Sequence, residues 1–163
     1  MKFYNRENEL AELKRIQRLS FEENSRLTVI TGRRRIGKTS LIMKAVDEMP
    51  TVYLFMKLLS VVSLSPSISG ALNIFVPAEI RSFSSLFQYM MEIAGQRAFN
   101  LVIDEFQEFY NINNSIYSDI QNIWDRYRKE TKMNLIVCGS IYSLMNKILY
   151  KIIKSPLLGV PIL

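Results

Sequence analysis

The sequence predicts an α/β fold, in which helices cover both faces of a parallel β-sheet and so form three layers. Two observations support this prediction. Short apolar segments, which are typical of strands, alternate with longer segments whose apolar residues recur at helical spacing. The apolar segments are also nearly continuous, as is typical of parallel strands buried on both faces. With 163 residues, 48% of them hydrophobic, the chain is long enough for one domain with a substantial core.

The first half of the chain contains two predicted helices and two predicted strands. Leucine and isoleucine recur every three positions in residues 6–20, which predicts an amphipathic helix, and an apolar strand follows at residues 27–31. A second helix begins after a glycine-containing loop and should end at Pro50, so that residues 51–57 form a second buried strand. The inward-facing residues predicted for the second helix are Leu41, Ile42, Ala45, Val46 and Met49.

The second half begins with a segment that has no regular period. Serines, prolines and a glycine interrupt residues 58–77, so the sequence assigns no element there. Beyond that segment the alternation of helix and strand resumes. The elements predicted in this part are helix 82–97, strand 99–104, helix 115–130, strand 133–139 and helix 143–153.

Composition and charge limit the classes of function. The N-terminus "MKFYNRENEL" lacks the apolar core of a signal peptide, and the longest apolar segment, "VYLFMKLLSVVSL", is interrupted by a lysine and serines. The single cysteine, Cys138, cannot form an internal disulfide and is expected to be a buried apolar residue. These features predict a cytoplasmic protein with no membrane partner. The net charge of +6 is compatible with a nucleic-acid partner, but the 21 basic residues are spread along the chain.

A phosphate-binding pattern follows the first predicted strand. The segment "TGRRRIGKTS", residues 31–40, matches G-x-x-x-x-G-K-[ST] and lies between a strand and a helix. In that position two glycines permit a tight turn, backbone N–H groups converge on phosphate oxygens, and the helix N-terminus adds positive potential. Lys38 should reach the terminal phosphates, and the Thr39 hydroxyl should bind Mg²⁺. The residues of this loop expected to hold the nucleotide are Gly32, Arg33, Arg34, Arg35, Ile36, Gly37, Lys38, Thr39 and Ser40.

An acidic pair ends a later strand. The segment "NLVIDEFQEF" places Asp104 and Glu105 after four largely apolar residues. Asp104 is expected to bind Mg²⁺, directly or through water, and Glu105 to activate an attacking water as general base. The structural alternative is that the two carboxylates only cap a strand end. Ser140 follows the apolar run "LIVC" and a glycine and should lie beside the terminal phosphate, although Gly-Ser after a strand is also ordinary turn chemistry. The predicted catalytic residues are Lys38, Glu105 and Ser140.

Four segments in this order resemble the archaeal-type ATPase family, in the STAND branch of AAA+-related P-loop NTPases: "FYNRENELAEL", "GRRRIGKTSLI", "LVIDEFQEF" and "CGSIYSLMNKIL". The resemblance covers roughly residues 3–57 and 75–157. It implies an ASCE P-loop fold with strand order 5-1-4-3-2, ATP with Mg²⁺ as ligand, and Ser140 as a polar sensor after the fourth strand. It also implies that Asn5 and Arg6 lie near the adenine and ribose, while simple capping of the first helix by Asn5 is an equal alternative.

Two segments depart from the family pattern. The stretch between Lys57 and Glu79 is uncharged where family members usually carry charge, and the chain ends in "SPLLGVPIL" where they continue through a fifth strand and a helical lid. A slip of reading frame would explain both departures, and a fragment of a longer chain is the alternative. We therefore expect a single P-loop ATPase domain over residues 1–163 that is incomplete at its C-terminus. Its first strand should be an unpaired apolar edge, which favours self-association.

The resulting hypothesis is a domain that binds MgATP and hydrolyses it slowly, as the motor or switch for a protein effector. The alternatives are a non-hydrolysing nucleotide-dependent switch or scaffold, a truncated inactive relic of such an ATPase, and a nucleic-acid-binding module. A GTPase is disfavoured, because residues 146–149 lack the aspartate of the guanine-reading Asn-Lys-x-Asp pattern. A small-molecule kinase is disfavoured, because it would not need the acidic pair.

Overall fold

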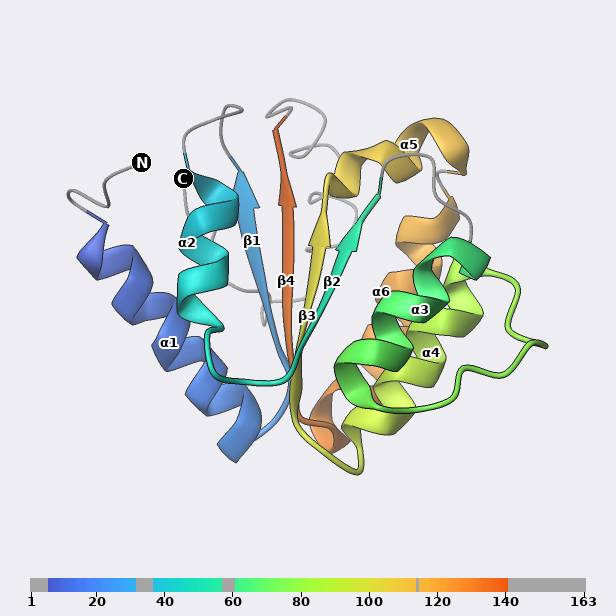
Figure 1. Cartoon of the computed structure of the whole chain (residues 1–163), viewed down its shortest axis with the longest axis horizontal. Coiled ribbons are helices and arrows are strands. Elements are labelled where there is room, and N and C mark those ends of the chain that lie inside the picture. The colour runs from blue at the N-terminus through green and yellow to red at the C-terminus, as the bar shows by residue number, and fades with distance from the viewer. Residues whose placement is uncertain (1–5, 32–36, 57–60, 114, 141–163) are drawn as a thin grey trace.

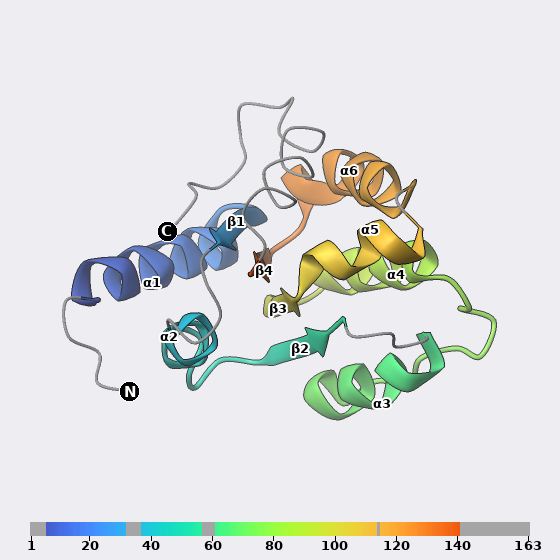
Figure 2. The ribbon, with the colours of Figure 1, turned by 90° about the horizontal axis from the view of Figure 1, so that it is seen from above.

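The computed structural model describes residues 6–31, 37–56, 61–113 and 115–140, and these residues form three layers (Figure 1). Two helices cover one face of the sheet, two cover the other, and a further helix lies beside strand β2 (Figure 2). The first pair is α1 (Glu7–Glu22) and α2 (Lys38–Ala45), the second pair is α4 (Phe83–Ala94) and α6 (Ser115–Tyr127), and the further helix is α3 (Val61–Leu72). A short helix, α5 (Phe109–Ile112), precedes α6. The predicted α/β fold is confirmed.

The sheet has four described strands in the order β1-β4-β3-β2, and each neighbouring pair is parallel. The strands are β1 (Arg26–Thr31), β2 (Thr51–Phe55), β3 (Phe99–Asp104) and β4 (Met133–Gly139). This order agrees with the 1-4-3-2 part of the arrangement that the family resemblance implies. The register aligns Thr31 with Gly139 and Phe55 with Asp104, so the carboxyl ends of all four strands meet at one edge of the sheet.

The predicted helix 143–153 lies outside the described residues, and so does the segment 157–163, in which the sequence predicts no fifth strand. Among the described strands, β1 pairs with β4 alone. The expectation that β1 is an unpaired edge therefore stays a prediction.

Apolar side chains form one cluster on each face of the sheet, because successive residues of a strand point to opposite faces. On the face under α4 and α6, four aromatic rings pack with centroids 4.7–6.2 Å apart. These rings belong to Phe83, Phe106, Phe109 and Tyr117. On the face under α1 and α2 the cluster is aliphatic and smaller, and it includes Leu13, Ile42 and Cys138. Burying each large apolar side chain contributes about 1.5–3 kcal/mol.

Two local expectations were wrong, and one segment without an assigned element contains a helix. α2 ends at Ala45 rather than at Pro50, and Met49 is 39% exposed instead of facing inward. β2 ends at Phe55 and alternates between buried and partly exposed residues, because the face that carries Val52 and Leu54 is covered more completely than the opposite face. Among the described strands it is the outermost. The unassigned segment contains α3, whose Leu64, Ile68 and Leu72 are buried although Pro66 lies inside the helix. Here packing of an i, i+4, i+8 apolar stripe overrides the low helix propensity of the segment.

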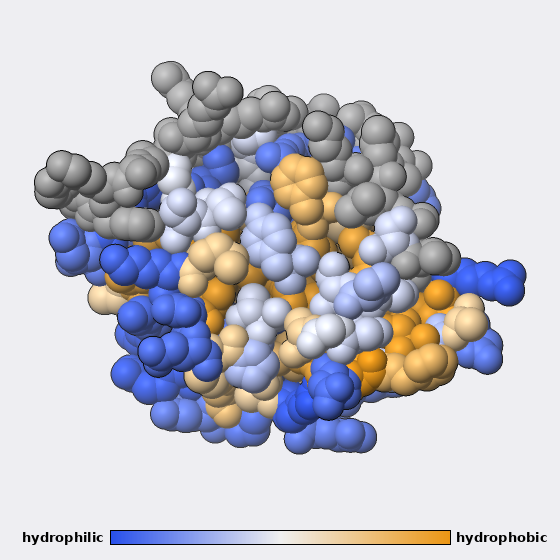
Figure 3. Space-filling view, in the orientation of Figure 1, coloured by the Kyte–Doolittle hydropathy of each residue, from blue (hydrophilic) through white to orange (hydrophobic). Residues whose placement is uncertain are grey.

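The remaining elements agree with the sequence pattern, although α1 ends two residues later than predicted and α4 is shorter than predicted. β3 and β4 have the predicted bounds, whereas the helix expected over 115–130 ends at Tyr127 and continues as a 3₁₀ turn, Arg128–Glu130. Hydrophilic side chains cover the outer surface of α1 (Figure 3). In the part of the chain that the structure describes, no helix combines the length and the apolar character needed to cross a membrane.

Candidate nucleotide-binding site

The predicted phosphate loop joins β1 to α2 at the carboxyl edge of the sheet. Gly37 precedes the first residue of α2 and has φ 88°, a left-handed conformation that a residue with a β-carbon adopts only with strain. α2 begins at Lys38, so its first unbonded N–H groups lie directly after this turn. The predicted residues that lie outside the described part of the chain are Asn5, Gly32, Arg33, Arg34, Arg35 and Ile36.

The first turn of α2 presents its three polar residues differently. Lys38 is 9% exposed, whereas Thr39 and Ser40 are exposed. The positive charge of Lys38 acts on the thiol of Cys138, which lies at the end of β4. Because Lys38 is nearly buried, its side chain does not extend into solvent, and it is positioned to contact a phosphate at the start of α2.

The two predicted metal ligands lie together. Thr39 Oγ1 donates a hydrogen bond to Asp104 Oδ2 at 3.4 Å, although the residues are 65 positions apart in the sequence. Thr39 comes from the start of α2 and Asp104 from the last position of β3. The fold therefore brings the start of α2 next to the end of β3, and the Thr39 hydroxyl lies beside the Asp104 carboxylate, as the sequence pattern predicts.

Asp104 is almost completely buried, with 6% exposure, and each of its carboxylate oxygens accepts hydrogen bonds. Oδ1 accepts from the backbone N–H of Glu105 at 2.8 Å and from Cys138 Sγ at 3.1 Å. Oδ2 accepts from Thr39 Oγ1 and from the hydroxyl of Tyr53. Buried charge is costly unless hydrogen bonds replace its lost hydration, and these four donors supply that replacement.

Strand register explains why Tyr53 and Cys138 meet Asp104. Ile103 aligns with Val137, so the next residue on each strand, Asp104 and Cys138, are also neighbours. Tyr53 aligns with Val102, two positions before Asp104, and therefore shares its face of the sheet. Burial and the nearby Asp104 carboxylate raise the pKa of the Cys138 thiol, and the same two causes raise the pKa of the Tyr53 hydroxyl. Both groups therefore remain protonated donors at neutral pH.

The predicted general base lies in a tight turn directly after β3. Glu105 has φ 55° and ψ 45°, a left-handed conformation, and this turn directs the chain into a 3₁₀ helix, Phe106–Glu108. Ser140 Oγ donates to Glu105 Oε2 at 3.4 Å, so the two predicted catalytic residues of different strands come together. The amide Nε2 of Gln107 also donates to Glu105 Oε2.

Sequence reasoning did not identify Tyr53, Cys138 or Gln107 as part of this site. Gln107 is 1% exposed in the structure, and its place two residues after the predicted base was the available signal in the sequence. A tyrosine in an otherwise apolar strand was the signal for Tyr53, because a buried phenol normally has a hydrogen-bond partner. Cys138 is buried, as expected, but its thiol also touches the acidic residue.

The donor set fits magnesium. Thr39 and Asp104 offer hydroxyl and carboxylate oxygens, the hard ligands that Mg²⁺ prefers. Within the described ranges, no group of three or more His, Cys, Asp or Glu residues could hold a metal ion without help. Mg²⁺ is typically bound by one or two carboxylates together with substrate phosphates and water, so this small set is compatible with an ion that arrives with a nucleotide.

Comparison with known sequences identifies relatives along nearly the whole chain. Residues 3–159 match the model of a family described as "ATPase domain predominantly from Archaea". The chain is also similar to an uncharacterized protein of Methanocaldococcus jannaschii, with 29% identity over 148 residues that make up 91% of this chain and 32% of the relative. The chain thus spans about a third of the length of that relative.

Solved structures of larger proteins share the fold. A Walker-type ATPase of Pyrococcus abyssi superposes with a TM-score of 0.65 and 19% identity, over 96% of this chain and 51% of that one. The ORC1 protein of Aeropyrum pernix, solved in complex with DNA, gives a TM-score of 0.68 and 16% identity, over 97% of this chain and 44% of that one. At these identities the similarity shows the fold alone.

Sequence, fold and relatives therefore agree. The parallel sheet in the order β1-β4-β3-β2 is the arrangement of the P-loop NTPase fold that these structures share, and the glycine loop opens α2 directly after β1. The family match includes the loop, the acidic pair and Ser140. The chain belongs to the family of ATPase domains that occurs predominantly in Archaea.

Proposed function

We propose that this domain binds MgATP at the loop between β1 and α2 and hydrolyses it slowly, to drive or gate an effector domain or a partner protein. The observation that carries the proposal is the convergence of four predicted residues at one edge of the sheet. Thr39 contacts Asp104, and Ser140 contacts Glu105, each at 3.4 Å. Asp104 and Glu105 are adjacent, so the two contacts form one continuous polar site.

Binding would use the loop and the start of α2. The backbone N–H groups after Gly37 and the N-terminus of the helix suit a polyphosphate, and Ser40 adds a hydroxyl in the same turn. Lys38 would bind the terminal phosphates as a positive charge, because it starts α2 and lies low against the sheet. Thr39 and Asp104 would hold Mg²⁺, which when bound neutralises negative charge on the phosphate oxygens.

Hydrolysis would use Glu105 as the base. A water that attacks the terminal phosphorus must lose a proton, and a carboxylate oxygen of Glu105 would accept it. Ser140 would donate a hydrogen bond to the terminal phosphate in exchange for the one it donates to Glu105 Oε2. This role makes Ser140 a sensor of whether the terminal phosphate is present.

The partners of Glu105 support slow turnover. Its Oε2 accepts hydrogen bonds from both Gln107 and Ser140, so the base is held by two donors before any water is bound. A base held in this way must exchange at least one donor for the attacking water. That requirement is compatible with a nucleotide-dependent switch of the STAND type, in which a partner releases the base and raises the rate.

The test is nucleotide-dependent thermal stability with a matched pair of lysine variants. MgATP should raise the melting temperature of the parent, because a ligand that binds only the folded state stabilises it by mass action. Lys38→Ala should remove most of this rise. Lys44→Ala changes a lysine in the last turn of the same helix and should leave the rise intact. An unchanged melting curve of the parent at millimolar MgATP would contradict the proposal.

A nucleic-acid-binding domain is the second candidate function. The net charge of +6 favours it, as does the similarity in fold to the ORC1 protein solved in complex with DNA. Affinity for a DNA duplex should then fall steeply with salt, because binding releases counterions from the phosphates. Binding that persists in Lys38→Ala would place the nucleic acid outside the nucleotide loop, whereas binding that is insensitive to salt would argue against this candidate.

A further inference from the structure

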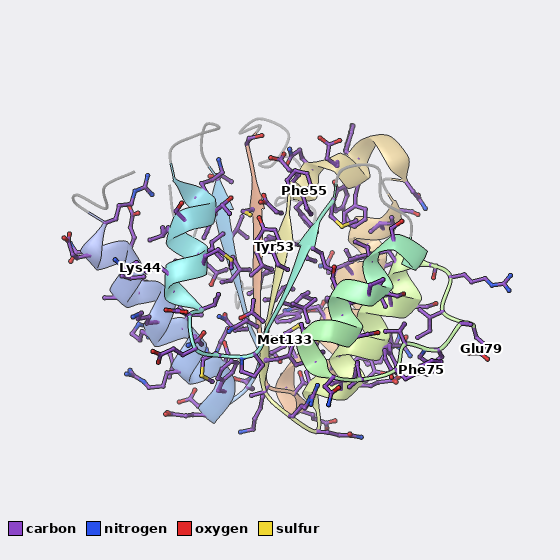
Figure 4. The ribbon with its side chains drawn as sticks, viewed as in Figure 1. Lys44, Tyr53, Phe55, Phe75, Glu79 and Met133 are labelled. Carbon is purple, nitrogen blue, oxygen red and sulfur yellow. The ribbon has the colours of Figure 1, made fainter. Side chains whose placement is uncertain are left out.

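Tyr53 reaches the acidic site from the outermost strand. It lies on β2, on the face of the sheet that α2 covers, and packs against the aliphatic cluster of that face (Figure 4). Its hydroxyl donates to Asp104 Oδ2, the same oxygen that accepts from Thr39 Oγ1. No sequence motif includes Tyr53, and the proposed reaction assigns no role to it.

The two oxygens of Asp104 differ in how firmly their donors are held. The donors to Oδ1 are a backbone N–H and the thiol of Cys138, which is fully buried on β4. Neither can leave without disturbing the sheet. The donors to Oδ2 are two side-chain hydroxyls, of which Thr39 is exposed and donates over 3.4 Å, a long distance for a hydrogen bond. Any change in the hydrogen bonding of Asp104 must therefore occur at Oδ2.

A carboxylate has about four lone-pair positions, and the four donors named above occupy all of them. If Thr39 held a metal ion, its oxygen would offer a lone pair to the ion and its O–H would remain able to donate. Asp104 could serve the ion, directly or through water, only by exchanging one of its hydrogen bonds, and the long one from Thr39, at 3.4 Å, is the one most easily exchanged. The Tyr53 hydroxyl would hold the other position on Oδ2 and keep the carboxylate in its present rotamer.

We propose that Tyr53 is a positioning residue that orients Asp104 for magnesium-dependent binding of the nucleotide. This inference rests on the proposed function, since it requires that Asp104 serve the metal. The ring of Tyr53 supplies rigidity, because it is packed against the cluster under α1 and α2. Its hydroxyl supplies direction, because it is the only donor to Oδ2 among the described residues that does not belong to the phosphate-loop helix.

The experiment compares Tyr53→Phe with Tyr89→Phe in the full chain. Both substitutions remove one phenolic hydroxyl, but that of Tyr89 donates to the backbone carbonyl of Phe75, on the far side of α4 from the site. The quantity measured is the ratio of the ATP dissociation constant in EDTA to that in excess Mg²⁺, by calorimetry. Tyr53→Phe should lower this ratio about tenfold and leave the constant in EDTA unchanged, because Asp104 would lose the hydrogen bond that holds Oδ2 in place. Tyr89→Phe should keep the parental ratio.

A double-mutant cycle separates positioning from general weakening of the fold. In an Asp104→Asn background, Tyr53→Phe should no longer change the ratio, whereas a merely structural effect would persist. A parental ratio in Tyr53→Phe would overturn the inference and leave the proposed function intact. A raised ratio would also overturn it, because Tyr53 would then compete with the metal for Oδ2. Absence of ATP binding by the parent, with and without Mg²⁺, would overturn the proposed function and the inference together.

Discussion

The face of the sheet under α4 and α6 and the face under α1 and α2 differ in size and in polarity. The first carries the larger apolar cluster, with the aromatic rings of Phe83, Phe106, Phe109 and Tyr117. The second is smaller and aliphatic, and at the carboxyl edge of the sheet it passes directly into the polar site around Asp104. Stability should therefore depend mainly on the first face, and nucleotide chemistry on the edge of the second.

The largest expected effect tests the α4/α6 face. Phe87 on α4 is fully buried there, so Phe87→Ala should lower the free energy of unfolding by about 3–5 kcal/mol, from lost burial and the cavity left behind. Chemical denaturation with urea measures this change. At a temperature where the variant is folded, its affinity for MgATP should stay close to that of the parent. A loss of affinity without a loss of stability would break the division between the two faces.

The next effect concerns the edge of the α1/α2 face. Glu105→Gln keeps the shape of the side chain but removes the base, so turnover of ATP should fall by roughly a hundredfold or more while binding persists. Steady-state phosphate release and calorimetric binding measure the two quantities. Asp104→Ala is the contrasting variant, since it should weaken the magnesium-dependent part of binding. Equal loss of binding in both variants would indicate that Glu105 is a metal ligand or a structural residue.

The smallest effect is a dependence of stability on alkaline pH. The pKa of Cys138 is raised in the folded chain, by burial first and by Asp104 second. An unfolded cysteine loses its proton near pH 8.5, whereas the folded one keeps it. This contribution to stability is therefore complete below that pH and declines above it, by about 1.4 kcal/mol per pH unit at most.

Cysteine and tyrosine variants separate the contributions of the two faces to this decline. In Cys138→Ala the decline in stability should begin only near pH 10, where tyrosines ionise in the unfolded chain. Tyr53 and Tyr117 should cause this later decline, because burial raises the pKa of both in the folded chain. Adding Tyr117→Phe should then remove the contribution of the α4/α6 face to the decline in stability above pH 10. Urea denaturation between pH 8 and 11 measures the slopes, and an unchanged onset in Cys138→Ala would contradict the assignment.

Local pattern was sufficient to predict several elements. The strands that became β3 and β4 have the predicted bounds, because a continuous apolar run flanked by polar residues has few other ways to fold. The order of the residues in "GRRRIGKTS" likewise anticipated a turn at Gly37 followed directly by a helix. Both predictions depend only on residues that are close in the sequence, so they do not require knowledge of the tertiary structure.

Tertiary structure decided the features that depend on contacts between distant residues. β2 was expected to be buried throughout, but the face that carries Phe55 is less covered than the opposite one and leaves Phe55 41% exposed. α3 forms in a segment where serines, prolines and a glycine obscured an i, i+4, i+8 apolar stripe, and this stripe packs beside β2. The neighbour of a strand and the surface that meets a helix are not encoded in a local pattern, which is why the burial of β2 was mispredicted and α3 was left unassigned.

The candidate site shows the same division. The sequence by itself determined which groups would be available: a lysine and a threonine after a glycine turn, two adjacent carboxylates after a strand, and a serine after another. Only the tertiary structure decided that Thr39 faces Asp104, that Ser140 and Gln107 hold Glu105, and that Tyr53 and Cys138 complete the shell of Asp104. The reason is physical. Parallel pairing aligns the carboxyl ends of separate strands, and the resulting register, set by burial of both faces of the sheet, selects which side chains become neighbours.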